Sequence, residues 1–116
     1  VDDYIALVLP GGQINPDVLR ADKDAVGKIR DFVTGDKIVA AICHAPWLLI
    51  EADLVKGKTL TSYHSIRTDM KNAGANVVDE EVAEDGNLIT SRNPDDIPAF
   101  SDRLISRVLE RVPEDA

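Results

Sequence analysis

The stretch VAAICHAPWLL, residues 39–49, decides the fold that this sequence predicts. Small and apolar residues lead into Cys43, the only cysteine, and a histidine and a proline-bearing apolar segment follow it. Residues 38–42 are typical of a buried parallel strand, and proline is tolerated in the first turn of a helix. We therefore expect a strand that ends just before Cys43 and a helix that runs from His44 to about Leu54.

The rest of the chain alternates between strand-like and helix-like patterns. Asp22 is placed to cap a helix that Gly35 ends, and Glu-Asp-Gly-Asn at residues 84–87 is a hairpin signal. Further strands are expected at residues 4–9, 59–62, 82–84 and 88–90 and from Val77, and further helices at residues 65–73 and from Asn93 onward, with Ile97, Phe100, Leu104, Ile105 and Val108 packed on the sheet. Such alternation predicts a single α/β domain, in which a mostly parallel sheet is covered on both faces and carries an added antiparallel hairpin.

The composition is that of an ordinary globular domain with an acidic balance of charge. Of the 116 residues, 44% are hydrophobic, and 13 Lys and Arg against 21 Asp and Glu give a net charge of −8. Because the sequence has no cluster of Lys and Arg, neither nucleic acid nor an anionic membrane is an expected partner. The acidic runs at residues 79–81 and 84–85 are interpreted as a solvated hairpin face. One cysteine fits the reducing cytoplasm, and no apolar run reaches the length of a membrane span.

A strand that ends in cysteine and leads at once into a helix places the thiol at the carboxyl edge of a parallel sheet, where α/β proteins bind ligands. Such a turn is a nucleophile elbow. It exposes the reactive side chain in a strained backbone conformation, and the helix N-terminus favours the thiolate. His44 would then stabilise the anion or shuttle a proton. The alternative is that Cys43 is a buried structural cysteine with a chance histidine neighbour.

The loop Pro10-Gly11-Gly12 ends the preceding strand at the same edge of the sheet. The backbone N–H groups of Gly11 and Gly12, together with that of His44, would form an oxyanion hole. His64 follows the third strand and is a second candidate histidine, with a solvated loop residue as the alternative. Two histidines and one cysteine without zinc-type spacing predict no metal site, and no cofactor is expected.

Short motifs are distributed along essentially the whole chain. They are Val8-Leu9-Pro10-Gly11-Gly12, Asn15-Pro16-Asp17, Ala41-Ile42-Cys43-His44-Ala45-Pro46, Leu60-Thr61-Ser62-Tyr63, Asp85-Gly86-Asn87 and Thr90-Ser91-Arg92. In this order they resemble the PfpI intracellular-protease family of the class I glutamine amidotransferase-like superfamily. The resemblance implies a flavodoxin-like three-layer α/β sandwich, with residues 1–116 as one domain. It also implies that the chain lacks the family's N-terminal βαβ portion, which carries a glutamate that hydrogen-bonds the cysteine.

The resemblance assigns roles to particular residues. It implies that Cys43 is the nucleophile with His44 beside it, and that Asp17 from a neighbouring subunit completes the triad. Tyr63 matches a tyrosine near the nucleophile, and a half-buried strand aromatic is the alternative. The family usually has Gly-Pro-Gln after the Cys-His pair, where this chain has Ala-Pro-Trp, so Trp47 is expected beside the substrate.

The function that the resemblance implies is a cysteine-nucleophile hydrolase of the stress response, acting on glyoxal or methylglyoxal adducts or on small 2-oxoaldehydes. One alternative is an intracellular cysteine peptidase of the PfpI type, and the other is a redox-sensing stress protein or chaperone without true turnover. The expected partners are a small aldehyde or a glycated or peptide substrate, and further copies of the chain in a homodimer or a dimer-based hexamer. The expected location is the cytoplasm.

Overall fold

A four-stranded sheet forms the centre of the protein, whose computed structural model describes residues 6–10 and 18–111. Its strands are β1 (Ala6–Leu9), β2 (Ile38–Ile42), β5 (Ala83–Asp85) and β6 (Leu88–Ser91). They lie in the order β1-β2-β6-β5. Strands β1, β2 and β6 are parallel to one another, and β5 runs antiparallel to β6. The predicted mostly parallel sheet with an added hairpin is therefore confirmed.

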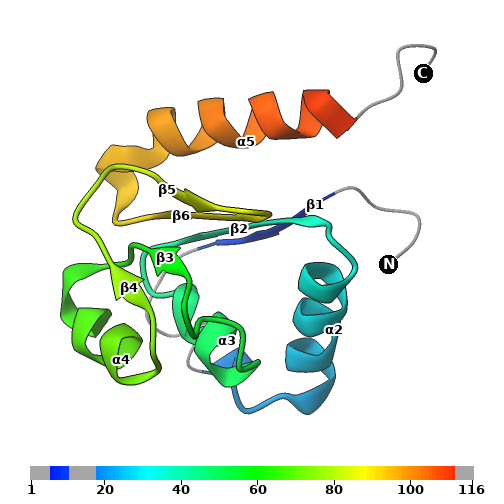
Figure 1. Ribbon diagram of the computed structural model, residues 1–116, viewed down its shortest axis with the longest axis vertical. Helices are drawn as coiled ribbons and strands as arrows, with labels where there is room; N and C mark the ends of the chain where they lie inside the picture. The colour runs from blue at the N-terminus through cyan, green and yellow to red at the C-terminus, as the bar shows by residue number, and fades with distance from the viewer. Residues whose placement is uncertain (1–5, 11–17, 112–116) are drawn as a thin grey trace.

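The helices cover both faces of this sheet. They are α2 (Lys23–Thr34), α3 (Pro46–Glu51), α4 (Arg67–Asn72) and α5 (Ile97–Arg111), with the 3-10 turns η1 (His64–Ile66) and η2 (Pro94–Asp96). Figure 1 shows α5 alone on one face of the sheet, whereas α2 and α3 lie on the opposite face and α4 lies to one side. The arrangement is a flavodoxin-like sandwich, as the sequence predicts.

Local signals position α2 as predicted, but α3 is shorter than expected. The side chain of Asp22 accepts hydrogen bonds from the first-turn amides of α2, and Gly35 is its C-cap. The sequence predicts a helix as far as Leu54, whereas α3 ends at Glu51. Asp53 has a φ of +59°, and this left-handed conformation stops the helix.

A second, two-stranded parallel sheet joins β3 (Thr59–Leu60) to β4 (Asn76–Val77). The sequence predicts a longer strand over residues 59–62. The ladder stops early because Thr61 N donates to the side-chain Oγ1 of Thr90 at 2.9 Å instead of to a backbone carbonyl of a neighbouring strand. The buried residues that follow β3 therefore form a loop, and this loop leads to the candidate site.

The core consists of two clusters separated by β2, all of whose residues are buried. Val39 and Ala41 belong to the cluster on the α2 side, and Ile38, Ala40 and Ile42 belong to the cluster on the α5 side. This alternation is the two-residue period of a strand that is buried on both faces.

Helix α5 packs on the sheet through a narrower stripe than the sequence predicts. Phe100 is buried, and the half-buried Leu104 and Val108 pack against the same cluster. Ile97 and Ile105 are 49% and 56% exposed, so their predicted packing on the sheet is wrong. At about 100° per residue, Ile105 lies about 60° from Val108, at the edge of the stripe, whereas Ile97 lies on the same face as the stripe but is the first residue of the helix.

Candidate active site

The chain turns sharply where β2 meets α3. Cys43, the first residue after β2, has a φ of +62°. Ala45 N closes the turn by donating to Ile42 O at 3.1 Å. A non-glycine residue in this left-handed region is strained by about 1–2 kcal/mol, so the surrounding structure must hold it in place. The strained elbow that the sequence predicts at Cys43 is confirmed.

Cys43 differs from the other described non-glycine residues with positive φ. These are Asp36 and Asp53, each with a φ of 59°. Both are exposed and follow helices, and aspartate tolerates this conformation better than most residues. Cys43 is only 8% exposed and follows a strand, so its strain has no such local explanation.

Two other segments fix the backbone of Cys43. Its N–H donates to the carbonyl of Ser91, the last residue of β6, at 3.1 Å. Its carbonyl accepts from the N–H of Tyr63, in the loop after β3, at 2.8 Å. The side chain belongs to the apolar cluster that includes Ile89 and Phe100. The ends of β2 and β6 and the loop after β3 therefore meet at this cysteine.

The His44 ring is enclosed by aromatic side chains. It stacks on Tyr63, with ring centroids 4.7 Å apart, and meets Trp47 edge-on, with centroids 5.1 Å apart. Ser65 Oγ lies 3.3 Å from His44 Nε2, within hydrogen-bond distance. The predicted proximity of Tyr63 and Trp47 to the Cys-His pair is thus observed, whereas no pattern in the sequence indicates Ser65.

Burial lowers the pKa of His44 below its ordinary value of 6.5, and the charge of His64 lowers it further. The imidazole is therefore neutral at neutral pH and able to accept a proton. Within residues 6–10 and 18–111, no Asp or Glu side chain forms an ion pair or hydrogen bond with His44. Of the two roles open to His44, proton transfer fits this neutral ring better than stabilisation of an anion by charge.

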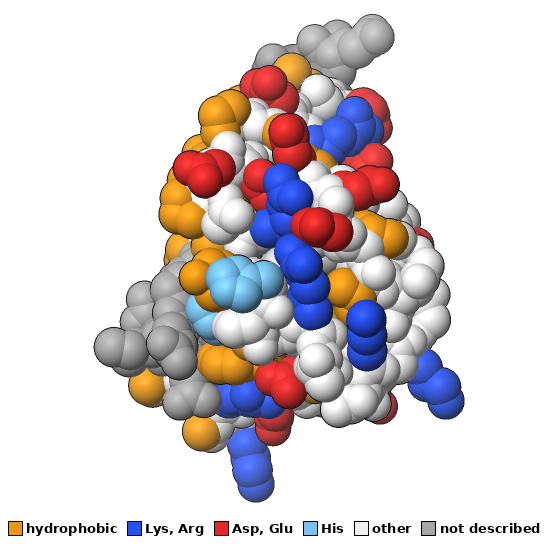
Figure 2. Space-filling view, turned by 90° about the vertical axis from the view of Figure 1, so that its left-hand side faces the viewer, with side chains coloured by type: hydrophobic (Ala, Val, Ile, Leu, Met, Phe, Trp, Pro, Cys, Tyr) orange, Lys and Arg blue, Asp and Glu red, His pale blue; other side chains and the backbone are white. Residues whose placement is uncertain are grey.

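His64 lies beside the pair and not at the cysteine. It is the first residue of η1 and is exposed. Its ring contacts the ring of Tyr63, and the two ring centroids are 4.3 Å apart. Figure 2 shows histidine atoms next to hydrophobic side chains and a band of Lys and Arg, although His44 itself is only 9% exposed. The solvated alternative for His64 describes its position, although its charge reaches His44.

The other predicted site residues Gly11, Gly12 and Asp17 lie outside the residues that the structure describes. The strand that leads to them is described, and it is parallel to β2, with Leu9 paired to Ala41. β1 therefore brings the chain to the sheet edge at which Cys43 stands.

The third predicted donor of the oxyanion hole is the backbone N–H of His44. No acceptor for this N–H occurs in the described part of the chain, although the neighbouring amides of Cys43 and Ala45 are both hydrogen-bonded. An amide that follows the proposed nucleophile and has no acceptor among the described residues is suited to a developing negative charge on a substrate oxygen.

An arginine–carboxylate network lies at the same sheet edge, next to Ser91. The side chain of Arg92 binds Asp96 through Nε and Nη2, each at 2.9 Å, and Arg92 N donates to the same carboxylate. Arg92 and Arg67 both bind Asp79 Oδ1 at 2.9 Å. Glu84, in turn, pairs with two arginines of α5. The interpretation of these residues as a solvated face holds, since Asp79 and Glu84 are exposed, and the arginine pairs add to it.

The described ranges contain neither a cluster of metal-ligating side chains nor a membrane-spanning helix. No three His, Cys, Asp or Glu side chains there are close enough together to hold a metal ion. No helix there combines the length and hydrophobicity of a membrane-spanning segment.

Comparison with known proteins adds evidence from outside the chain. A model of the DJ-1/PfpI family matches residues 1–107. General stress protein 18 of Bacillus subtilis is 54% identical over 100 residues, and protein/nucleic acid deglycase 2 of Escherichia coli is 52% identical over 100 residues. Each alignment covers 85% of this chain and 58% of the relative, so the chain spans just under three fifths of the length of these relatives.

A solved structure agrees with the fold. A two-domain protein from Anabaena variabilis, with DJ-1/ThiJ/PfpI-like and ferritin-like domains, superposes with a TM-score of 0.90 and 43% sequence identity. The superposition covers 92% of this chain and 30% of that one.

Proposed function

Because the chain belongs to the DJ-1/PfpI family, we propose that it is a cysteine-dependent hydrolase of small 2-oxoaldehydes or their adducts, of the glyoxalase or deglycase type. The observation that carries the proposal is the strained Cys43, whose φ of +62° is held in place beside His44. The name of the Escherichia coli relative, protein/nucleic acid deglycase 2, supports the substrate class.

The first step is attack of the Cys43 sulfur on the aldehyde carbon of methylglyoxal. A carbon–sulfur bond forms, and the carbonyl electron pair moves to the oxygen. The N–H of His44 donates to this oxyanion, and the amides of Gly11 and Gly12 are the further donors that we propose. Preorganised N–H groups stabilise the oxyanion because they need no reorientation when the charge develops.

The later steps need no external oxidant. The neutral His44 imidazole removes the proton from the carbon that carries sulfur, and a proton is returned to the adjacent carbon. The aldehyde carbon thereby becomes a thioester, while the ketone becomes a secondary alcohol. Water then attacks the thioester, the carbon–sulfur bond breaks, and lactate and the free thiol are released.

Turnover of methylglyoxal by the purified chain tests this proposal. We expect consumption of methylglyoxal to match formation of lactate, and expect Cys43→Ala to abolish both. His64→Gln is the matched control, because it changes the exposed histidine that does not contact His44 directly and should keep most of the turnover. Turnover that persists in Cys43→Ala, while circular dichroism shows a native fold, would overturn the proposal.

Two further assays separate the alternatives. Release of an unmodified amine from a methylglyoxal-treated peptide would place the substrate among adducts, whereas cleavage of an untreated peptide would favour the peptidase. Oxidation of Cys43 by peroxide with no turnover of any of these substrates would favour a redox sensor. The name of the Bacillus subtilis relative, general stress protein 18, supports a stress role for this chain. We also propose that this chain is located in the cytoplasm.

We further propose that Asp17 of a neighbouring subunit completes the site in a homodimer or dimer-based hexamer. The support is that His44 has no carboxylate partner among the described residues. An acid donated across a two-fold interface would serve both subunits, and it would raise the pKa of His44 against the lowering by burial.

Mixing inactive subunits tests the shared site. Cys43→Ala and Asp17→Ala chains, each inactive alone, should regain activity when mixed, because each heterodimer then contains one intact site. If activity stays absent although mass spectrometry shows subunit exchange, Asp17 acts within its own chain or has no role.

A further inference from the structure

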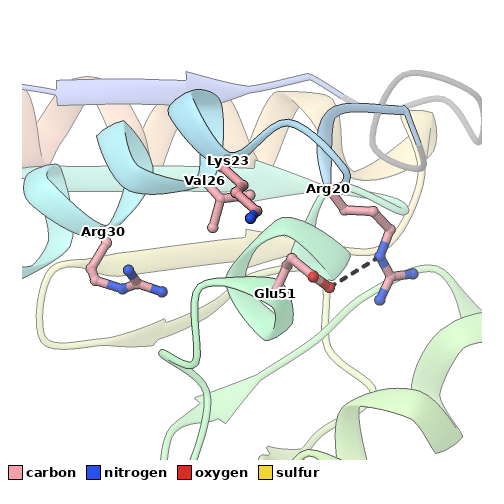
Figure 3. Close-up of a pocket in the computed structure, with 5 residues that line it drawn as sticks. All are labelled: Arg20, Lys23, Val26, Arg30 and Glu51. Atoms are coloured by element: carbon pink, nitrogen blue, oxygen red, sulfur yellow. Dashed lines mark ion pairs between the residues drawn. The ribbon is translucent and has the colours of Figure 1, made fainter.

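A basic cavity lies between α2 and α3, and neither Cys43 nor His44 lines it. Its volume is about 300 Å³, and its lining residues are Arg20, Lys23, Val26, Arg30 and Glu51. Three of the five residues carry a positive charge and one a negative charge, in a chain whose net charge is −8. Figure 3 shows Lys23 and Arg30 projecting from α2, and Glu51 of α3 pointing toward Arg20. The cavity is thus a local concentration of positive charge on an acidic protein.

The two arginines are held through their Nε atoms. Arg30 Nε donates to the carbonyl of Ala52 at 3.1 Å, and Arg20 Nε lies 3.5 Å from a carboxylate oxygen of Glu51. In the described part of the chain, the terminal Nη groups of Arg30 and the ammonium group of Lys23 have no hydrogen-bond or ion-pair partner. The cavity therefore presents a positioned guanidinium and an ammonium group whose donors are free to bind a ligand.

We propose that this cavity binds a phosphate dianion, either as free phosphate or as the phosphate group of a small molecule. A guanidinium fork matches the oxygens of phosphate, and lysine adds a compact positive charge. The volume is at the small end of ligand cavities and fits a phosphomonoester of few atoms. A nucleic acid fits poorly, because the surrounding protein is acidic. Glu51 opposes the anion and so limits its affinity.

Trp47 reports on the cavity. It is the only tryptophan of the chain, and the guanidinium carbon of Arg20 lies 5.2 Å from its ring centroid. A phosphate that draws Arg20 toward the cavity would change this cation–π contact and with it the fluorescence of Trp47. The binding site itself does not depend on the proposed reaction of Cys43, so the failure of either proposal can be recognised separately.

The experiment titrates inorganic phosphate into the purified chain at constant ionic strength, followed by Trp47 fluorescence and by calorimetry. We expect saturable binding, weakened roughly tenfold by Lys23→Gln or Arg30→Gln and strengthened by Glu51→Gln. Lys28→Gln, on the same helix but outside the lining, should bind as the native chain does. The Lys23 side chain makes no hydrogen bond to the described residues, so the effect of Lys23→Gln reports on the ligand and not on the fold.

A second ligand identifies the source of the phosphate group. Tighter binding of glycerol 3-phosphate than of inorganic phosphate would support a phosphorylated small molecule, and the reverse order would support free phosphate. The proposal is overturned if calorimetry shows no saturable binding, if glycerol alone binds equally well, or if Arg30→Gln and Lys28→Gln have the same affinity.

Discussion

Replacing Cys43 by glycine and by alanine tests whether its positive φ stores strain. Both variants lack the thiol, but only alanine keeps a Cβ that conflicts with a φ of +62°. The left-handed conformation is about 1–2 kcal/mol less favourable for alanine, whereas glycine loses about 0.4–1 kcal/mol through the freedom of its unfolded chain. We therefore expect Cys43→Gly to exceed Cys43→Ala in free energy of unfolding by roughly 0.5–1 kcal/mol.

Ala45 provides the control, two residues along the same turn. It is fully buried and has an ordinary helical conformation, with φ of −56° and ψ of −30°. Glycine at this position relieves no strain, so Ala45→Gly should lower the free energy of unfolding by about 1 kcal/mol or more. Glycine in place of alanine is thus expected to raise the free energy of unfolding at residue 43 and to lower it at residue 45.

Urea unfolding followed by far-ultraviolet circular dichroism measures these differences. The comparison requires equal dependence on denaturant in both variants, since a changed slope would indicate a changed unfolded or native state. The refuting result is a Cys43→Gly variant less stable than Cys43→Ala by the margin seen for glycine at residue 45. The conformation at Cys43 would then not be a strained one.

Three other predictions follow from burial and charge. In the Asp17→Ala chain, which lacks the proposed partner acid, the imidazole of His44 should titrate below 6.5 in NMR spectra; adding His64→Gln should raise its pKa without restoring 6.5, because burial is the larger cause of the lowering. The neutral His44 ring contributes stability that is present above pH 6.5 and is lost as the pH falls toward its lowered pKa. A His44 pKa above 6.5 would contradict the lowering by burial. Asp96→Asn should lower the free energy of unfolding by about 2 kcal/mol at neutral pH, because the buried carboxylate loses its charge-assisted hydrogen bonds. Since its arginine partner lowers the pKa of Asp96, this difference should vanish as the pH falls below the ordinary 3.8, and a difference that persists in acid would argue against the ion pair. Leu104→Ala should cost about 2 kcal/mol and Ile105→Ala much less, since only Leu104 packs on the sheet; equal costs would place both side chains in the same environment.

Patterns that depend on nearby residues could be predicted from the sequence. The cap at Asp22, the end of α2 at Gly35 and the strained turn at Cys43 all follow from neighbours in the chain. The failures arise where tertiary structure decides. The periodicity of α5 could not show which part of the helix the sheet covers, and therefore the sequence predicts Ile97 and Ile105 in the core although both are exposed.

The charged and polar clusters were beyond prediction for the same reason. The ion pairs of Asp79 could not be predicted, because its arginine partners lie at residues 67 and 92. Ser65 approaches His44 across 21 positions of the chain. The cations of the α2–α3 cavity are spread over residues 20–30 and form no run in the sequence, and only the fold gathers them opposite Glu51.

The burial of the Cys-His pair bears on which substrates the proposed hydrolase would accept. Cys43 and His44 are only 8% and 9% exposed, and Tyr63 and Trp47 lie against the histidine ring. An extended peptide needs an open groove along its backbone, because its carbonyl must approach the sulfur together with the residues on either side. An aldehyde of a few atoms requires only a narrow opening. Burial therefore favours a small 2-oxoaldehyde, or an adduct on a protruding side chain, over a peptide bond. If Trp47 limits access, Trp47→Ala should increase cleavage of peptides relative to turnover of methylglyoxal, whereas an unchanged ratio would show that access is limited elsewhere.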